Sequence, residues 1–381
     1  MNQPRYILSP CGTSLWTNGA DEVERKLLTT HANVGKPEEV PEADRVLLQA
    51  RMDAARAGML TTDGLSVEEQ NKIAARKSAE LNGILKLCGG TPAAGQDYHL
   101  LLCTDTWLGE QSALLVADWL RMRHVSVEVK RQRDLQTRDL AAFRMALSEL
   151  VQWAETTLNA YRESRYKIVF NLTGGFKSVQ GFLQSLGMFY ADETVYIFEN
   201  STDLLRIPRL PVRLATEETV REHLQLFRRL NLRLPVPAPT PIPETLLLEY
   251  EEQTELSVWG QVAWEQARRT LYREKVWPSP SEHIRFGERF LASVQSLPPD
   301  RCFIVNQQLD ELARFFESKL DSKYNLSSLD FKELRGNPIP PATHELDAWH
   351  DLDARRVFGH FAPEEASSHI FILDRLDKAL H

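Results

Sequence analysis

The feature that most restricts the fold of this chain is an alternation, through its first half, of short apolar runs with longer segments of helical periodicity. Five runs have the length of a strand: RYILS near residue 5, YHLLLC at 98–103, VSVEV at 125–129, YKIVFNL at 166–172 and ETVYIFEN at 193–200. Strands that alternate with helices indicate a mainly parallel sheet covered by helices on both faces. We therefore expect residues 1–214 to form one α/β Rossmann-like domain.

A long insertion and a proline-rich segment interrupt this pattern. Residues 21–87 show helical spacing and are interpreted as an extra helical layer or a dimer contact. Further along, LPVPAPTPIPE places a proline at every second position from 235 to 243. Such a segment is excluded from helices and central strands and predicts an extended spacer of roughly 25–30 Å, at about 3.1 Å per residue. Amphipathic helices on both sides of it make residues 215–282 a predicted helical connector with a Pro-rich spacer.

The last hundred residues follow a different order. Two helix-like segments, HIRFGERFLASVQSL and VNQQLDELARFFESKL, come first. Three strand-like segments with short polar turns then follow closely, and they are THELDAWH, DARRVFGHF and SHIFILDRLD. Helices followed by a meander of strands are typical of a small α+β domain with an antiparallel sheet. We assign this domain to residues 283–381.

Composition limits the classes of function. The formal net charge is -8, so the chain lacks the basic excess that proteins use to hold nucleic acid by bulk electrostatics. Its 4 cysteines show no CxxC spacing, which argues against a zinc ribbon and a disulfide framework. The N-terminus lacks a secretion signal, and no apolar run reaches the about 18 residues of a membrane span. We expect a cytoplasmic protein.

Small polar residues and glycines follow three of the predicted strands. In NLTGGFKS the spacing differs from the GxxxxGK[ST] of a P-loop, and SPCGTSLWTNGA after the first strand lacks the GxGxxG of a dinucleotide site. Exposed backbone amides of the glycine pair, at the start of a helix and beside a lysine, suit phosphodiester groups, although the pair also fits close helix packing. The binding candidates are Thr13, Ser14 and Asn18 after the first strand, Thr104 and Asp105 after the second, and Thr173, Gly174, Gly175 and Lys177 after the fourth.

CGTSLWTN, together with NLTGGFKSVQGF about 160 residues later, resembles the CRISPR-associated Rossmann fold (CARF) domain over residues 1–214. The resemblance implies a homodimer that binds a cyclic oligoadenylate on its two-fold axis, with cyclic tetra-adenylate as the expected activating ligand. It implies ligand contacts from Thr13, Ser14, Thr173, Gly174, Gly175 and Lys177. Some members of the family also cleave their ring slowly, and the sequence leaves that activity open.

The C-terminal segments SLDFKELRG, ARRVFGHF and ILDRLDKALH resemble the RelE/ParE toxin fold, in particular the RelE-type mRNA interferases, over residues 283–381. The resemblance implies ribosome-dependent cleavage of mRNA by the RNA's own 2′-OH, without a metal or other cofactor. Such cleavage needs a base, an acid and cations that stabilise the transition state. The implied roles are phosphate contact or base assistance for Lys332 and Arg335, charge stabilisation for Arg356, further positive charge for Arg375 and Lys378, and acid or base for His381.

The acidic balance of this domain bears on how it would find RNA. Residues 283–381 contain 12 Lys and Arg against 16 Asp and Glu, whereas a free ribonuclease is expected to have a basic surface. A RelE-like enzyme can instead rely on the ribosome to hold the messenger. We therefore hypothesise that the connector at 215–282 docks on a ribosomal protein near the factor-binding region, such as the stalk.

Three alternatives stay open at the level of sequence. Arg355 to His360 matches the RxxxxH spacing of the all-helical HEPN ribonucleases that many CARF proteins carry, although RRVFGH is rich in strand formers. Glu317-Ser318-Lys319 suggests a metal-dependent PD-(D/E)xK nuclease. A CARF-linked transcription regulator, in contrast, would place a winged helix in the connector.

Overall fold

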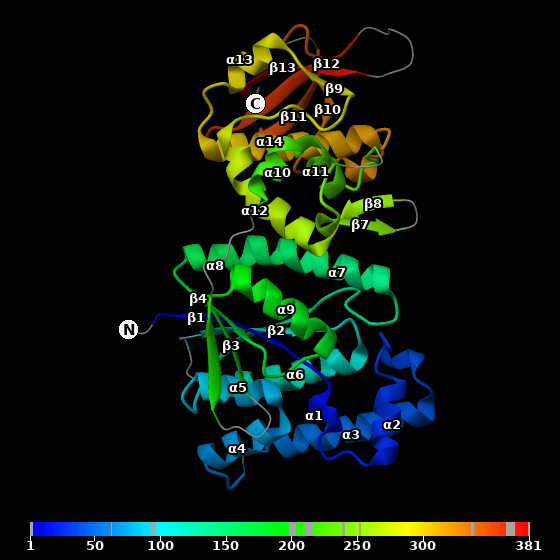
Figure 1. Cartoon of the computed structure of the whole chain (residues 1–381), viewed down its shortest axis with the longest axis vertical. Helices are drawn as coiled ribbons and strands as arrows, with labels where there is room; N and C mark the ends of the chain where they lie inside the picture. Colours follow the sequence, from blue (N-terminus) through cyan, green and yellow to red (C-terminus); the bar gives the residue numbers. More distant parts are fainter. Residues whose placement is uncertain are drawn as a thin grey trace. The chain divides into compact units, whose positions relative to one another are not determined.

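The computed structural model describes residues 3–61, 63–92, 95, 97–197, 203–209, 216–237, 241–250, 253–336, 339–362 and 370–379. The chain divides into two compact units, Met1–Arg213 and Leu214–His381 (Figure 1). No helix among the described residues has the length and apolar character needed to cross a membrane.

The first unit contains a six-stranded sheet of order β3-β2-β1-β4-β5-β6. Its strands are β1 (Arg5–Pro10), β2 (Asp97–Cys103), β3 (Ser126–Arg131), β4 (Lys167–Asn171), β5 (Glu193–Ile197) and β6 (Leu204–Pro208). All neighbours pair in parallel except β5 and β6, which are antiparallel. The five predicted strands and the mainly parallel α/β sheet are thus confirmed, and β6 is an edge strand that the sequence pattern did not reveal.

Helices cover both faces of this sheet (Figure 1). They are α1 (Ser14–Thr17), α2 (Glu22–Thr30), α3 (Glu42–Leu60), α4 (Val67–Lys77), α5 (Ala79–Leu87), α6 (Trp107–Arg121), α7 (Leu140–Trp153), α8 (Asn159–Glu163) and α9 (Lys177–Tyr190), with a 3-10 turn at Pro37–Glu39 and a π turn at Ala154–Leu158. On one face, Leu87 of α5 packs with Ile7, Val169 and Val195 of the sheet. On the other face, Tyr161 of α8 packs against the rings of Tyr6 in β1 and Tyr98 in β2. Helix α5, from the predicted insertion, therefore covers the sheet directly.

The second unit contains a five-stranded sheet of order β10-β11-β12-β13-β9 and a separate hairpin. The sheet strands are β9 (Ile284–Phe286), β10 (Lys332–Glu333), β11 (His344–Trp349), β12 (Arg355–Phe361) and β13 (Phe371–Lys378), and the hairpin is β7 (Leu247–Tyr250) with β8 (Gln253–Leu256). Neighbours are antiparallel except β13 and β9. The three predicted strands and the mostly antiparallel sheet are confirmed. The start of the predicted helix HIRFGERF is instead strand β9, because pairing with β13 outweighs its weak helical pattern.

Helices pack on one face of this second sheet. The helices of the unit are α10 (Glu217–Glu222), α11 (Leu224–Asn231), α12 (Val258–Glu274), α13 (Glu288–Val294) and α14 (Pro299–Glu317), with 3-10 turns at Glu244–Leu246 and Ser322–Tyr324. Phe290 of α13 and Leu309 of α14 share a core with Val357 and Phe371 of the sheet. The side chains at alternate positions of the strands point to the opposite face, where polar residues gather.

The helices of the predicted connector belong to the second unit. Phe227 of α11 packs with Trp264 and Tyr272 of α12. The fully buried Arg228 is paired with Asp310 of α14, with 2.7 Å between Nε and Oδ1, and the Tyr272 hydroxyl donates to the same carboxylate. In the proline-rich segment Ile242 is buried in the same cluster, so its described part packs on the helices instead of spanning open space, while Pro239 lies outside the described residues.

Candidate functional site

The loops that carry the two N-terminal motifs lie next to each other. Strands β1 and β4 are parallel neighbours, so the residues that follow Pro10 and Asn171 leave the sheet at the same edge. A Cβ added to Gly12 would lie 3.1 Å from the carbonyl carbon of Gly175, which shows how closely the loops approach. Gly175 has a φ of 109°, a conformation that favours glycine. The two predicted motifs therefore form one site at the carboxyl ends of the strands, where α/β sheets bind ligands.

A buried carboxylate fastens these loops together. Glu80 of α5 is 1% exposed, and its carboxylate accepts hydrogen bonds from the Gly12 N–H at 3.0 Å and the Ser78 hydroxyl at 2.7 Å. Burial raises the pKa of Glu80, although hydrogen bonds from these groups and from the backbone of Gly175 act in the opposite direction. The backbone of Gly175, expected to expose its amide to a ligand, therefore faces the Glu80 carboxylate.

The space taken by Glu80 explains the glycine next to it. A Cβ on Gly174 would lie 2.3 Å from Glu80 Oε1, so no larger residue fits there without displacing the carboxylate. No sequence motif indicated a functional role for this glutamate, since its contacts are with loops far away in the chain. Its one visible signal is an acidic residue at the start of the otherwise apolar segment AELNGILKL.

Side chains of β4 and α9 also hold the glycine loop in place. The Thr173 hydroxyl donates to Asn171 Oδ1 at 2.8 Å, and Gln180 of α9 donates to the carbonyl of Gly174 at 2.9 Å. Lys177, the first residue of α9, is exposed, and no described residue forms an ion pair with it. A cation at the N-terminus of a helix is disfavoured by the helix dipole. The lysine thus stands available for an anion from outside the chain.

Thr13 and Ser14 lie where the β1 loop enters α1. Thr13 is the N-cap residue of this short helix, but its side chain makes no capping hydrogen bond. The Ser14 hydroxyl is buried and has no hydrogen-bond partner in the described part of the chain. Both hydroxyls therefore remain uncommitted beside the glycine loop.

The remaining N-terminal candidates have partners within the protein. Thr104 is buried and shares a hydrogen bond of 2.9 Å with the hydroxyl of Thr106, the N-cap of α6. The Asp105 carboxylate accepts from Arg131 at 2.8 Å and from the backbone N–H of residue 134 at 3.0 Å. Asn18 is exposed and donates to the carbonyl of Lys77 at 3.4 Å. The structure thus groups Thr13, Ser14, Thr173, Gly174, Gly175 and Lys177 and gives Thr104, Asp105 and Asn18 structural contacts.

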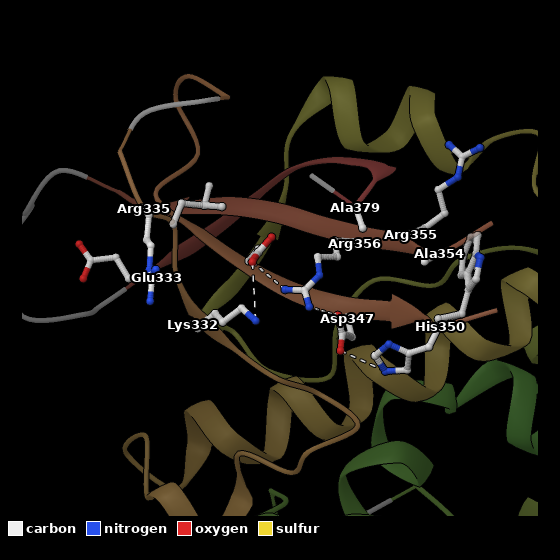
Figure 2. A pocket seen from close by; sticks show the side chains of 12 residues that line it. Lys332, Glu333, Arg335, Asp347, His350, Ala354, Arg355, Arg356 and Ala379 are labelled. Atoms are coloured by element: carbon white, nitrogen blue, oxygen red, sulfur yellow. Dashed lines mark ion pairs between the residues drawn. The ribbon is translucent and has the colours of Figure 1, made fainter. Parts of the chain in front are cut away.

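A second candidate site lies on the polar face of the second sheet. A pocket of about 770 Å³ opens there between β10, β11 and β12 (Figure 2). The strand register sets Lys332 opposite Glu345 and Asp347 opposite Arg356, so these four side chains occupy one face. Figure 2 shows Lys332, Asp347 and Arg356 in the middle of the pocket, with His350 at one end and Arg335 at the other.

The cations of this pocket are paired with carboxylates. The guanidinium of Arg356 lies 2.6 Å from Glu345, 2.8 Å from Asp347 and 3.0 Å from Asp330, and Lys332 pairs with the same Asp330. Burial opposes ionisation of Asp330, but hydrogen bonds from Lys332 and Arg356 prevail and lower its pKa. Burial raises the pKa of Asp347 despite the charge of Arg356. Three carboxylates therefore neutralise Arg356 and Lys332, while the pocket wall also carries the cations Arg335 and Arg355.

The other predicted C-terminal residues are placed differently. Arg335 lines the pocket, and Arg375 lies opposite Phe358 in the register, on the same face as Arg356, where it pairs with Asp377 at 3.1 Å. Lys378 lies opposite Arg355, which places it on the other face of the sheet. His381 lies outside the described residues. The structure therefore brings together Lys332, Arg335 and Arg356, with Arg375 on the same face.

A histidine that was not among the predicted site residues lines this pocket. His350 directly follows β11, and its side chain is 62% exposed. Its Nε2 lies 3.0 Å from Oδ2 of Asp347, whose other oxygen contacts Arg356. Figure 2 shows the imidazole beside the Asp347 carboxylate. The i, i+3 spacing in LDAWH was a visible signal, but the bulge at the end of β11 that brings the two side chains together was not.

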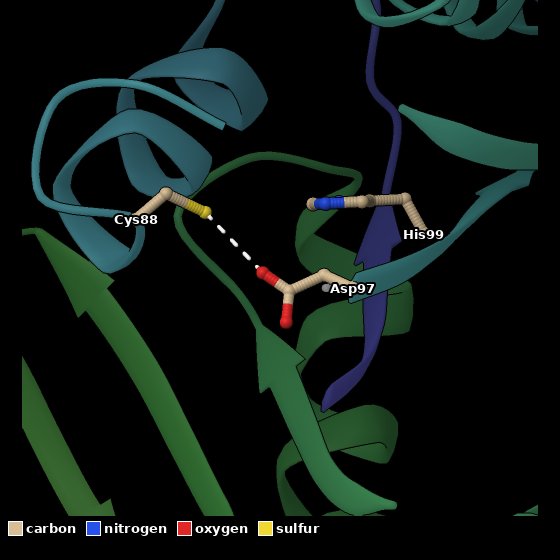
Figure 3. Close-up of side chains that lie close together, drawn as sticks. All are labelled: Cys88, Asp97 and His99. Atoms are coloured by element: carbon tan, nitrogen blue, oxygen red, sulfur yellow. Dashed lines mark hydrogen bonds between the residues drawn. The ribbon is translucent and has the colours of Figure 1, made fainter. Parts of the chain in front are cut away.

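A third cluster of polar side chains lies in the first unit, around the start of β2. Ligating atoms of Cys88, Asp97 and His99 lie within 4.8 Å of one another (Figure 3). Arg5, however, binds both oxygens of Asp97, with Nε 2.9 Å from Oδ1, and donates to Cys88 Sγ at 3.5 Å. Because a guanidinium already neutralises this carboxylate, we interpret the cluster as a structural ion pair. His99 is fully buried, and neither ring nitrogen has a hydrogen-bond partner in the described part of the chain.

The mostly parallel sheet covered by helices places the first unit in the Rossmann-like α/β class. Residues 75–210 match the family model of the CRISPR-associated protein family Cas_APE2256, a CARF-domain family. The matched region includes Glu80, the glycine loop and Lys177 and ends before the second unit. No curated protein shows a significant match to the chain. The predicted CRISPR association of this region is therefore confirmed.

Proposed function

We propose that the protein is a CRISPR ancillary ribonuclease that is activated by a cyclic oligoadenylate and cleaves mRNA on the ribosome. The observation that carries the proposal is the family match together with the site it contains. Two adjacent loops, held by Glu80, present an unpaired lysine at the start of a helix. A site with one lysine at the start of a helix suits the phosphodiester groups of a ring better than a nucleoside triphosphate, which needs more positive charge.

The sensing step uses a homodimer in this proposal. A ring of four adenylates has approximate two-fold symmetry, and an isologous dimer presents the same loops twice. Thr13, Thr173 and Lys177 of each protomer contact the ring. In a slow cleavage of the ring, the same hydroxyls and lysine would favour in-line attack of an adenylate 2′-OH on the adjacent phosphate.

The catalytic step uses the polar face of the second sheet, in a domain of RelE/ParE type. A mostly antiparallel five-stranded sheet with helices on one face supports this assignment, and Arg356 and Lys332 supply the cations that RNA cleavage requires. The helical HEPN alternative is disfavoured, since Arg355 to His360 lie in strand β12. The PD-(D/E)xK alternative is disfavoured as well, since Glu317 ends helix α14 and pairs with Arg229 at 3.2 Å.

The ion pairs of the pocket explain why the ribosome enters the proposal. Glu345, Asp347 and Asp330 already neutralise Arg356 and Lys332, so these cations would hold free RNA weakly and the ribosome must hold the messenger. Recruitment then depends on protein contacts, and helices α10 to α12 of the predicted connector are the proposed docking element for a ribosomal protein such as the stalk.

Primer extension on an mRNA carried by translating ribosomes tests this proposal. Purified protein with cyclic tetra-adenylate should cut the ribosome-bound messenger in the decoding site and leave the same mRNA intact when ribosomes are omitted. A gel shift on promoter DNA should show no binding. Cleavage of naked RNA at equal rate would favour a ribosome-independent nuclease, and a DNA shift without any cleavage would favour a transcription regulator.

A further inference from the structure

We propose that His350, oriented by Asp347, is the general base that takes the proton from the 2′-OH of the RNA at the pocket of the second unit. The proposal rests on the proposed ribonuclease function and identifies a catalytic group for it. It is carried by the geometry of a histidine, a buried carboxylate and an arginine that share one pocket wall.

One nitrogen of the imidazole faces a carboxylate and the other is open. Nε2 lies 3.0 Å from Asp347 Oδ2, and because a carboxylate can only accept, this ion-pair contact favours the tautomer with the proton on Nε2. The lone pair of a neutral imidazole is then on Nδ1. The side chain is 62% exposed and lines the pocket, so Nδ1 is within reach of a substrate there. A base needs this combination of a set tautomer and an open nitrogen.

Asp347 couples the base to the cation that the reaction needs. Its side chain is 4% exposed, and its two oxygens contact His350 and Arg356, respectively. When the imidazole becomes protonated, the buried carboxylate stabilises the positive charge beside it, as in other histidine–carboxylate pairs. Arg356 is held on the same carboxylate, next to the place where the phosphorus gains negative charge.

The reaction balances without a further reactant. Nδ1 takes the 2′-OH proton, the 2′-oxygen attacks the adjacent phosphorus, and the bond from phosphorus to the 5′-oxygen breaks. The imidazolium, directly or through water, returns a proton to the departing oxygen. The products are a 2′,3′-cyclic phosphate and a 5′-hydroxyl, with no net consumption of water.

A second histidine of the same sheet offers a matched control. His360 of β12 is also paired with a carboxylate, since its Nδ1 lies 2.8 Å from Asp374. Its side chain is only 20% exposed, however, and it does not line the pocket. Both histidines therefore form a histidine–aspartate pair, but only His350 can meet RNA in the pocket.

The experiment measures cleavage of ribosome-bound mRNA by the full chain with saturating cyclic tetra-adenylate. His350→Ala and His350→Gln should lower the rate by about 10²-fold or more, the usual loss when a general base is removed. Added imidazole should restore part of the activity of His350→Ala, and His360→Gln should cleave at the wild-type rate. His350 is largely exposed, so neither variant should change the thermal unfolding temperature.

Three results would overturn the assignment. His350→Ala within about threefold of wild type would exclude a base role, because a general base contributes far more. An inactive His350→Ala that imidazole does not restore would make His350 a positioning residue. Wild-type protein that leaves the messenger intact would contradict the proposed function itself, which distinguishes that failure from the first two.

Discussion

The two sheets of this protein offer different places for chemistry. The first is mainly parallel and covered by helices on both faces, so its functional groups stand only where the strands end (Figure 1). The second is mostly antiparallel and covered on one face, so charged side chains in its strands can line an open pocket. We infer that the loops of the first sheet can recognise a ligand, whereas the open face of the second can bring together acids, bases and cations for a reaction.

Carboxylates also act differently in the two regions. In the first unit a single buried glutamate, Glu80, fixes two loops by accepting hydrogen bonds from their backbone. In the second, three carboxylates surround Arg356 and neutralise it. The first arrangement sets the shape of a site. In the second, Arg356 stays paired with carboxylates until a substrate phosphate competes for it.

The largest predicted effect tests whether the helices at 217–274 are an integral part of the second unit. Arg228 in these helices pairs with Asp310 of α14, so a substitution there breaks one of their buried contacts. Arg228→Ala should lower the free energy of unfolding by about 3–5 kcal/mol, since Asp310 would remain as an unpaired buried charge. Chemical denaturation of the full chain measures the loss. Arg221→Ala, which breaks an exposed pair with Glu274, is the matched control and should have a small effect. Equal effects of the two variants would show that the helices are not an integral part of this unit.

The covered faces of the first sheet predict a dependence of stability on pH. Burial lowers the pKa of His99 to about 4, against an ordinary value near 6.5. Between these values the unfolded chain binds more protons, so stability is lost as pH falls through this window, by about 3 kcal/mol in total. His99→Leu should remove this component. Unfolding measured at several pH values for both proteins tests it, and parallel curves would contradict it.

Substitution of two glycines tests whether the Glu80 carboxylate determines the shape of the glycine loop. Gly174→Ala should cost about 1–3 kcal/mol, because its Cβ would meet the Glu80 carboxylate at 2.3 Å. Gly181→Ala, inside helix α9 with open space around it, should instead stabilise the protein by roughly 0.5–1 kcal/mol. Thermal unfolding of both variants decides the matter. A shift of the same sign in both would mean that the loop does not depend on Gly174.

The last prediction concerns ligand binding by the lysine of the first site. Lys177→Ala should weaken binding of cyclic tetra-adenylate about tenfold, or about 1.4 kcal/mol. It should leave stability unchanged or slightly higher, because a cation at a helix N-terminus is unfavourable. Titration calorimetry gives the affinity, and Lys177→Arg serves as the charge-preserving control. An unchanged affinity of the alanine variant would remove Lys177 from the site.

Much of the fold follows from periodicity in the sequence. Strands β1 to β5 and β11 to β13 are apolar enough to be predicted from their own residues. In contrast, β6, β9 and β10 are short or polar and depend on the neighbouring strand that they pair with. Local pattern carries no information on such pairing, so one edge strand of the first sheet and both edge strands of the second were missed.

The candidate sites were predicted less completely. The glycine loop and Lys177 stand in one recognisable motif. Glu80, however, acts on loops that precede and follow it by 68 and more residues, a contact that only the folded sheet creates. The Asp347–His350 pair likewise depends on a local bulge in β11. Charge neutralisation around Arg356 requires side chains from three separate segments, although the acidic composition indicated its sign.

The rate of mRNA cleavage on translating ribosomes, measured against the concentration of cyclic tetra-adenylate, tests most directly whether the first site controls the second. We predict no cleavage without the ring, a saturable increase with it, and a curve for Lys177→Ala displaced to higher ring concentration with the same maximum rate. Cleavage at full rate in the absence of the ring, or an identical curve for both proteins, would contradict the account.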